Sequence, residues 1–584
     1  MLGLKHAPTP ANHGLGANKT ASHSVLNQKP LELSEKSLTE FLAQSRKTRL
    51  TEQQDFAFLA PFELVARAKG ALIVSEWLEG ISPFRAMHEL RNQAPTIDAF
   101  QLTVVTGRVS VTAELWQKTL VARKTGRFGI EVTHNGSKHR VSPLQSIATN
   151  RVLAKYFAAR LDEKHLTPEE FFSGGGELHL LECRQFILQC GKSASAIETY
   201  RGNRLIAADQ SPEKLSERLI SGIARWFMSN QDAEGGLPYK YWPSSGIYSD
   251  SDNPIRRFMA SVAFNRMAHA LGRQDMKVAA RKNLDYNLRR FYRVESGMGV
   301  IAWDGSAKLG SLALAGLAIL ESPFAESWKA ELAELRGTIN TLWQPSGAFR
   351  TFVYPTNRND NQNFYPGEAL LFWAISLQKN HDQALLSQAV RSVYFYRSHF
   401  RKDSNPAFVP WHSQAALILY RFTGDEGIRD FIFEMNDWLL PHQQWGGSVD
   451  PDHWGRFYSP HKPKYGPPHA SSTGVYLEGL VDALVLARDV GDTARAAAYR
   501  QAVERGIRSL AQLQFRDDLD AYYVSQKERV IGAIRTETYN NEIRIDNLQH
   551  GLMALLKYRE LDRSESQNTP STREARSAQP AEAH

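Results

Sequence analysis

Between residues 215 and 561 the chain alternates two kinds of apolar stretch six times. One kind has apolar residues at helical spacing with charged residues between them, as in Leu215, Leu219 and Ile223, and this pattern predicts an amphipathic surface helix. The other kind is apolar nearly all round and rich in Ala, Gly and Leu, which is typical of a helix buried on every side. We therefore predict six outer helices and six inner ones, with the inner helices over 255–271, 309–320, 368–377, 414–422, 475–487 and 547–558.

The links between these stretches also alternate in length. Each link from an inner helix to the next outer one is short and polar, as at Gly424 and Asp425, where Gly can end a helix and Asp can cap the next. The links from outer to inner helices are long: 231–253, 294–307, 344–364, 400–409, 442–471 and 515–541. In an array of antiparallel hairpins all long links emerge on one face, and long ordered loops are usually functional. We expect the chemistry on that face and an inert opposite face.

This arrangement resembles the (α/α)6 toroid of the six-hairpin glycosidase-like superfamily over residues 213–562. The segment Asn230-Gln231-Asp232-Ala233-Glu234-Gly235-Gly236 is similar to a stretch of the glucuronyl C5-epimerase C-terminal domain. The resemblance implies an inner barrel of helices that opens at one end into a sugar-binding cleft. The expected fold class is thus mainly α, with a toroid of six helical hairpins.

A smaller α+β domain is expected to precede the toroid, over residues 46–205. Helical stretches alternate there with β-like runs, and Asn135-Gly136 between two such runs predicts a hairpin turn. No phosphate loop, metal-ligand pair or nucleophile elbow stands out in this region. Substrate presentation, docking of a protein partner and oligomerisation all remain open as its role.

Composition limits the cellular context and the partners. No apolar run reaches the ~20 residues that cross a bilayer, and the polar segment 1–45 lacks the apolar core of a secretory signal. Segments 1–45 and 563–584 are expected to be disordered. Both cysteines, Cys183 and Cys190, precede the toroid, so a disulfide scaffold is excluded there and a cytoplasmic location is the default. The net charge of +8 permits an acidic partner such as a uronic-acid polymer, whereas no nucleic-acid partner is expected.

Aromatic and ionisable residues gather in the six long links and at the starts of the helices that follow them. Aromatic rings with polar tips suit stacking against sugars, and arginine can bind a carboxylate or sulfate with its planar fork. The residues expected to be catalytic are Asp304, Glu368, His412, Asp546 and His550. Those expected to bind substrate are Tyr241, Trp242, Asp252, Arg256, Tyr365, Trp411, Asp450, Trp454, His469 and Arg544.

Some of these residues also have simpler explanations. Asp252 equally fits the role of a helix cap, and the helix dipole alone favours Glu368 in a first turn. Asp546 and His550 lie one turn apart on one predicted helix. We expect the Asp546 carboxylate to fix the tautomer of His550 and to raise its basicity, which makes this pair the preferred centre of catalysis.

Two kinds of carbohydrate chemistry fit these groups. Glycoside hydrolysis needs two carboxyl groups across the bond, and the candidates are Asp252, Asp304, Glu368, Asp450, Asp452, Glu478 and Asp546. Uronate epimerisation or β-elimination needs a base and a positive group that stabilises an enolate, for which the arginines Arg256, Arg350 and Arg544 serve.

A non-catalytic role as a glycan-binding or scaffold protein is the alternative. No cofactor is expected, and no metal either, because the toroid contains no cysteine and no regular spacing of metal ligands.

Overall fold

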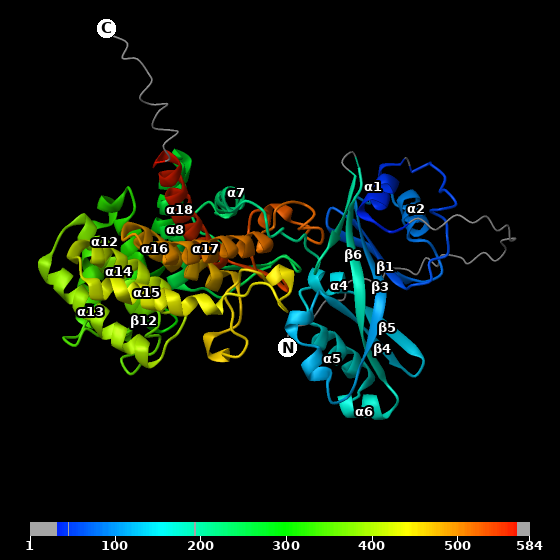
Figure 1. The fold of residues 1–584 in the computed structure, drawn as a ribbon, viewed down its shortest axis with the longest axis horizontal. Coiled ribbons are helices and arrows are strands. Elements are labelled where there is room, and N and C mark those ends of the chain that lie inside the picture. The colour runs from blue at the N-terminus through cyan, green and yellow to red at the C-terminus, as the bar shows by residue number, and fades with distance from the viewer. Residues whose placement is uncertain (1–31, 45, 192–193, 569–584) are drawn as a thin grey trace, which may run out of the picture.

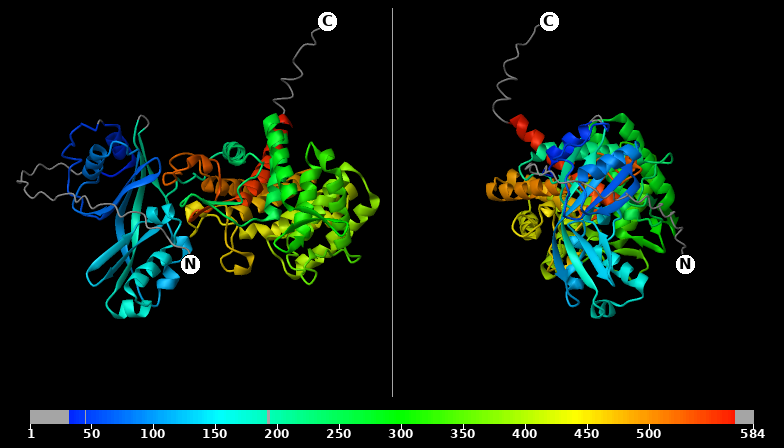
Figure 2. Two further views of the ribbon diagram at one scale, coloured as in Figure 1. Left: turned by 180° about the vertical axis from the view of Figure 1, so that it is seen from behind. Right: turned by 90° about the vertical axis from the view of Figure 1, so that its right-hand side faces the viewer.

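The computed structural model describes residues 32–44, 46–191 and 194–568, which form a sheet-rich N-terminal domain beside a helical toroid (Figures 1 and 2). The main core of the toroid also takes in Leu144, Ile147, Ala148 and Ile187 of the N-terminal domain, which has further cores of its own. Each part is described in turn.

The toroid contains the twelve predicted helices. The outer helices are α7 (Pro212–Asn230), α9 (Gln274–Phe291), α11 (Lys329–Leu342), α13 (Gln383–Lys402), α15 (Glu426–Leu439) and α17 (Thr493–Leu513). The inner helices are α8 (Pro254–Leu271), α10 (Leu309–Leu320), α12 (Tyr365–Lys379), α14 (Val409–Thr423), α16 (Ala470–Asp489) and α18 (Ile545–Asn568). All six inner helices that the apolar stretches predicted are thereby confirmed.

The inner helices form a closed ring. Each packs against the next in chain order, from α8 to α10, α12, α14, α16 and α18, and α18 packs back against α8. The outer helices pack against this ring, and α7 completes the outer layer by contacting both α17 and α18. This is the (α/α)6 toroid that the sequence predicted.

The short links have the predicted chemistry. Gly272 and Gly424 end α8 and α14 in the left-handed region, with φ of 65° and 66°, where a side chain would be strained. Asp425 and Asp492 cap α15 and α17 by accepting backbone N–H bonds. These turns hold each pair of helices antiparallel, so the long links all lie at the other end.

Two small sheets order the long links. One has the strand order β14-β15-β8-β9 and joins the sixth link to the first, with β8 at Lys240–Trp242, β9 at Ile247–Tyr248, β14 at Arg535–Glu537 and β15 at Asn540–Arg544. The other joins the second link to the third through β10 (Tyr292–Glu295), β11 (Met298–Trp303), β12 (Ser306–Lys308) and β13 (Phe352–Tyr354). The loops at this end are therefore tied to one another by backbone hydrogen bonds.

The N-terminal domain is built on an antiparallel sheet of order β2-β1-β3-β6-β4-β5, with β7 also paired to β6. Its strands are β1 (Phe62–Ala68), β2 (Ala71–Leu78), β3 (Ala99–Val111), β4 (Phe128–His134), β5 (Ser137–Val141), β6 (Glu177–Gln189) and β7 (Ser195–Thr199). The helices are α1 (Glu35–Ala43), α2 (Pro83–Gln93), α3 (Trp116–Thr119), α4 (Pro143–Ala148), α5 (Leu153–Lys164) and α6 (Pro168–Ser173). The expected α+β character of this region is confirmed.

This sheet repeats one unit twice, a feature that the sequence patterns did not reveal. Each half has a hairpin, a helical crossover and a 13-residue strand, and the long strands β3 and β6 pair at the centre. The predicted turn at Asn135-Gly136 is matched by Lys69-Gly70 in the first hairpin, and all four residues have positive φ. A Ser-Pro pair begins the crossover in both halves, where Ser82 and Ser142 cap α2 and α4.

The structure differs from the expected disorder at both edges. Helix α1 lies inside segment 1–45, because Leu38 and Phe41 are buried in the core of the N-terminal domain. Helix α18 continues to Asn568, beyond the predicted end of the toroid at 562. The rest of the two segments expected to be disordered, 1–31 and 569–584, lies outside the described residues.

Helix α16 is the one described helix that is long and apolar enough to cross a membrane on length and composition alone. It is also an inner helix of the toroid, with 83% of its apolar stretch buried. Its composition is therefore explained by its place in the ring.

Arg201 joins the two parts of the molecule. Its guanidinium is fully buried and pairs with Asp452 through Nε at 2.7 Å and with Asp450 through Nη2 at 2.8 Å, both in the long link 442–471. A buried charge without its partner is costly, so this ion pair fixes the N-terminal domain against the toroid.

Replacing Arg201 should therefore destabilise the whole chain. We expect Arg201→Met to lower the free energy of unfolding by ~3–5 kcal/mol, because the buried Asp452 loses its partner. Urea unfolding measures this change, and Arg184→Met is the matched control. Arg184 pairs with Glu198 at the surface, so its loss should cost under ~1 kcal/mol. Equal effects of the two variants would contradict this role of Arg201.

Candidate functional site

A cleft of about 390 Å³ opens at the long-link end of the inner ring. All six inner helices contribute to it, and most of the contributing residues lie in their first turns. The seven predicted site residues that line it are Arg256, Tyr365, Glu368, Trp411, His469, Asp546 and His550.

The inner helices all begin at this cleft. Their free backbone N–H groups and the positive ends of their dipoles therefore surround it. Such a position favours an anionic ligand, or negative charge that develops during a reaction.

Glu368 is a buried carboxyl without a partner. It is 3% exposed, and its Oε2 has no hydrogen-bond partner among the described residues. Burial raises the pKa of Glu368 to about 8, so the group is protonated at neutral pH. The helix dipole alone does not explain this residue, because a dipole would stabilise the ionised form. A protonated carboxyl at a cleft wall can act as a general acid.

His550 pairs with Glu478 rather than with Asp546. Its Nδ1 lies 2.8 Å from Oε1 of Glu478, whose side chain is completely buried on α16. The expected pairing of His550 with Asp546 is wrong, because Asp546 turns toward arginines on the other side. A carboxylate does orient His550, but it belongs to Glu478. Because Nδ1 of His550 faces this carboxylate, Nε2 is the nitrogen that can contact a substrate.

Asp546 is an ionised anchor for two arginines. Its carboxylate receives Nε of Arg256 at 2.7 Å and Nε of Arg544 at 3.0 Å. Burial by itself would raise the pKa of Asp546, but the two guanidinium groups outweigh it and hold the pKa well below its ordinary value. Asp546 therefore positions charge and cannot donate a proton.

Arg256 keeps donors for a ligand. Its Nη1 donates to the hydroxyl of Tyr239 at 2.7 Å, whereas Nη2 has no partner among the residues that the structure describes. Since the side chain is one-third exposed and lines the cleft, the expected role of Arg256 as an anion ligand is compatible with its geometry.

His469 is a neutral polar group of the cleft. Its side chain caps α16 and lies 2.7 Å from the hydroxyl of Ser471 through Nδ1. Burial lowers the pKa of His469 to about 4. The residue can offer hydrogen bonds to a sugar, but at neutral pH it carries no charge.

The cleft also contains residues that the sequence reasoning missed. Gln549 is 1% exposed, and both polar atoms of its amide lack partners within the described chain. It lies three residues after Asp546 and one before His550, so helical spacing could have placed it on the same face. Aromatic residues that complete the wall are Phe364, Tyr465 and Tyr476.

His412 lies outside the cleft. Its ring stacks on Phe408 with centroids 3.5 Å apart, and its Nδ1 lies 3.0 Å from the carbonyl of the same residue. Burial lowers the pKa of His412 to about 3. It does not line the cleft, so the expectation of a catalytic base at this position is not supported by its surroundings.

Several other predicted residues serve the loops instead. Asp304 is exposed in the turn between β11 and β12, with φ of 49°. The buried carboxylate of Asp252 pairs with Arg257 and Arg290, while Asn253 provides the cap of α8. Neither Asp304 nor Asp252 lines the cleft, and the ion pairs of Asp252 give it a structural role.

Tyr241 and Trp242 belong to β8, away from the cleft lining. Tyr241 is 2% exposed and packs on Tyr248, and Trp242 donates Nε1 to Glu542 at 3.1 Å. Both rings are thus committed to the small sheet that joins the first and sixth links.

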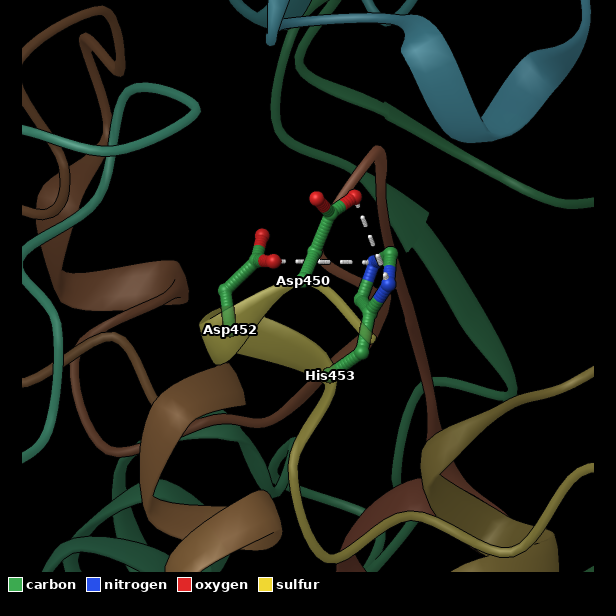
Figure 3. A group of neighbouring side chains, drawn as sticks. All are labelled: Asp450, Asp452 and His453. Atoms are coloured by element: carbon green, nitrogen blue, oxygen red, sulfur yellow. Dashed lines mark ion pairs between the residues drawn. The ribbon is translucent and has the colours of Figure 1, made fainter. Parts of the chain in front are cut away.

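Asp450, Asp452 and His453 form a compact group whose side chains point toward one another (Figure 3). The spacing of their ligand atoms would suit a metal ion. However, the Arg201 guanidinium already pairs with both carboxylates, so this side chain supplies the positive charge that a metal ion would otherwise supply. Asp450 is therefore an interface residue here, whereas Trp454 donates to the carbonyl of Val449 in its own link.

A second cavity, of about 760 Å³, opens at the short-link end of the ring. Two ion pairs line it, Arg266 with Glu321 and Lys557 with Asp482, at 2.7 Å in each case. The face that was expected to be inert thus has a sizeable cavity. The unpaired acid Glu368 and the base His550, however, lie at the other end of the ring.

Removing the buried acid should stabilise the protein at alkaline pH. Since the pKa of Glu368 rises from 4.5 to about 8 on folding, the native state holds a proton that the unfolded state loses between these values. Stability should therefore fall as pH rises from about 4.5 to 8. Above pH 8 we expect Glu368→Gln to be more stable than the natural chain by on the order of 5 kcal/mol, at ~1.4 kcal/mol for each pKa unit.

Thermal or urea unfolding at a series of pH values measures this difference. The control is Glu217→Gln, an exposed position on α7, which should leave the pH dependence unchanged. An unfolding curve of Glu368→Gln that keeps the natural pH dependence would refute the buried, protonated acid.

No family model matches this chain, and no curated protein matches its sequence. Among solved structures, an α-1,6-mannanase of Salegentibacter sp. HEL1_6 is similar with 11% identity and a TM-score of 0.43, over 60% of this chain and 100% of that one. An unsaturated glucuronyl hydrolase specific for heparin has 12% identity and a TM-score of 0.44, over 60% and 98%. A D-mannose isomerase has 13% identity and a TM-score of 0.46, over 60% and 100%. The fold of the chain itself is an (α/α)6 toroid, as its closed ring of inner helices shows.

Proposed function

We propose that this protein is a carbohydrate-active enzyme that performs general acid–base chemistry in the long-link cleft. The observation that carries the proposal is the presence of a protonated acid, Glu368, and a carboxylate-oriented base, His550, in one cleft. Two titratable groups in contrasting environments are the arrangement that proton transfer requires.

The ring places these two groups on opposing helices. Counting around the six inner helices, α12 with Glu368 and α18 with His550 are three positions apart. A ligand between them can meet an acid on one side and a base on the other. Trp411 and Tyr365 lie between and beside these groups in the cleft, and their rings suit the apolar faces of a sugar.

The charges around the cleft favour a reaction that develops negative charge. Arg256 offers a free donor, and the helix N-termini add positive potential. An oxocarbenium ion, which is positive, gains nothing from these groups. Abstraction of a proton next to a carboxylate is the better match, because the enolate that forms is negative.

We assign the steps as follows. His550 Nε2 takes the proton from the carbon next to the sugar carboxylate, and the electron pair of the broken C–H bond moves into an enolate that faces Arg256. Glu368 gives its proton to the opposite face of that carbon, which yields the epimer. If Glu368 instead protonates the departing glycosidic oxygen, the electron pair returns as a C=C bond and the result is elimination. Both groups then recover their protonation states from water.

Glycoside hydrolysis is the second candidate, and the raised pKa of Glu368 favours it. A protonated carboxyl is the group that an inverting or retaining glycosidase needs beside the leaving oxygen. In this version the His550–Glu478 pair activates water. The size of the cleft, about 390 Å³, is near the low end of the ~300–1,000 Å³ usual for small-molecule sites, and suits a short part of a saccharide in either case.

The enzyme proposal predicts a large loss of turnover in two single variants. We expect His550→Gln and Glu368→Gln each to lower kcat by roughly 10²–10⁴-fold, the usual contribution of one acid or base. His381→Gln is the matched control, because His381 is exposed beyond the other end of α12, and it should retain full activity.

A set of acidic and neutral polysaccharides provides the assay. New ultraviolet absorbance reports elimination, shorter chains without it report hydrolysis, and deuterium uptake from solvent without cleavage reports epimerisation. Binding without turnover by the natural protein on all of them would favour a non-catalytic glycan-binding role instead.

The pH dependence of the rate provides a separate test. Because Glu368 must be protonated to donate, kcat/KM should fall as pH rises through about 8, the pKa of this group. The residual activity of Glu368→Gln should not show this decrease of kcat/KM at alkaline pH, the alkaline limb of the profile. An unchanged limb in this variant would assign the titration to another group and exclude Glu368 as the acid.

A further inference from the structure

The N-terminal domain carries a strongly basic segment that runs from the end of α3 to the start of β4. Residues 118–127 contain Lys118, Arg123, Lys124 and Arg127 and no acidic residue. Lys118 and Arg123 are exposed, and the other two are half-buried. Within the described residues none of these four cations pairs with a carboxylate, so their charge is available to a partner.

Aromatic rings underlie this charge. The Arg127 guanidinium lies 4.9 Å from the ring centroid of Tyr200 and 5.4 Å from that of Phe128, and the Lys124 ammonium lies 5.6 Å from the Phe128 ring. Rings beside unpaired cations can bind the apolar faces of sugars together with their acidic groups.

The basic segment is attached to the link 442–471 of the toroid through Arg201. Arg201 donates through Nη1 to the carbonyls of Arg123 at 2.6 Å and Thr125 at 2.9 Å, while its other nitrogens pair with that link. The Tyr200 hydroxyl donates to Asp450 of the same link at 2.9 Å. The segment and the link are therefore held next to each other.

The same link also forms a wall of the cleft, to which it contributes Tyr465 and His469. Further half-buried aromatic groups lie on or beside this link. Tyr458 lies beneath the Arg456 guanidinium at 5.4 Å, and Tyr539 of the sixth link packs on His453 at 6.0 Å. Polar aromatic groups are thus available along the link from the cleft to the N-terminal domain.

We infer that the basic segment 118–127 is a secondary binding site for an acidic polysaccharide chain whose reacting unit lies in the cleft. This inference rests on the proposed function for the identity of the partner as a saccharide. The cleft is too small for a long chain, so the rest of a polymeric substrate must lie outside it. The link 442–471 leads to the group of unpaired cations, which complements the carboxylates of such a chain.

The test compares two triple variants of the full chain that remove equal charge. Arg123, Lys124 and Arg127 are changed together to Gln, and the control changes Lys214, Lys282 and Lys329, which are exposed on the outer helices α7, α9 and α11. Binding is measured by electrophoresis through gels that contain polygalacturonate, alginate, hyaluronan or neutral dextran. Turnover is measured on a long acidic chain and on the matching disaccharide.

We expect the segment variant to bind at least one acidic polymer roughly tenfold more weakly than the control at low salt, with the difference reduced at high salt. Its KM should rise on the long chain and stay unchanged on the disaccharide. Equal binding by the two triple variants would overturn the inference, and so would a segment variant that loses single-stranded DNA binding but no polysaccharide binding. If the natural protein binds an acidic polymer through this segment without turning over any saccharide, the proposed function fails, while the assignment of the segment as a binding site for an acidic polysaccharide stands.

Discussion

The toroid depends on the packing of α18 against α8, which closes the inner ring between the last hairpin and the first. Without this contact five neighbouring pairs would form an open array with two exposed apolar faces. Close approach on the other side of α18 supports the closure, since a Cβ at Gly474 of α16 would lie 2.6 Å from the backbone nitrogen of Gly551. Glycines at the crossing of α16 and α18 therefore allow the last helix to pack closely enough for the ring to close.

Closure also creates the chemistry of the cleft. Glu368 and His550 are far apart in sequence, and they reach one cleft because their helices are opposite members of a ring. The ring excludes water from the carboxyl of Glu368, which keeps it protonated, and it places Glu478 behind His550. The same burial would destabilise Asp546 as an anion, and two arginines from α8 and β15 offset that cost.

The N-terminal domain contacts two of the six long links directly. Arg201 binds the fifth link through Asp450 and Asp452, and Asn150 donates to Asn540 of the sixth link at 3.1 Å. The Asn541 side chain also contacts Ser244 of the first link. Since β15 runs from this interface directly to Arg544 and Asp546, the docking of the domain and the position of the cleft charges are mechanically linked.

The sequence by itself determined the twelve helices, their inner or outer position and the end of the toroid that carries the cleft, because apolar periodicity and turn chemistry are local properties. It also identified seven residues of the cleft, each within or beside the first two turns of an inner helix. It could not assign the partner of His550, since the choice of Glu478 over Asp546 depends on which helix lies behind α18. Nor could it predict that Glu368, Asp546 and His412 differ in protonation state, because the pKa of each group depends on its burial and on neighbouring charges. Those are set only when distant segments pack around each side chain, and so the tertiary structure alone decided which acid keeps its proton.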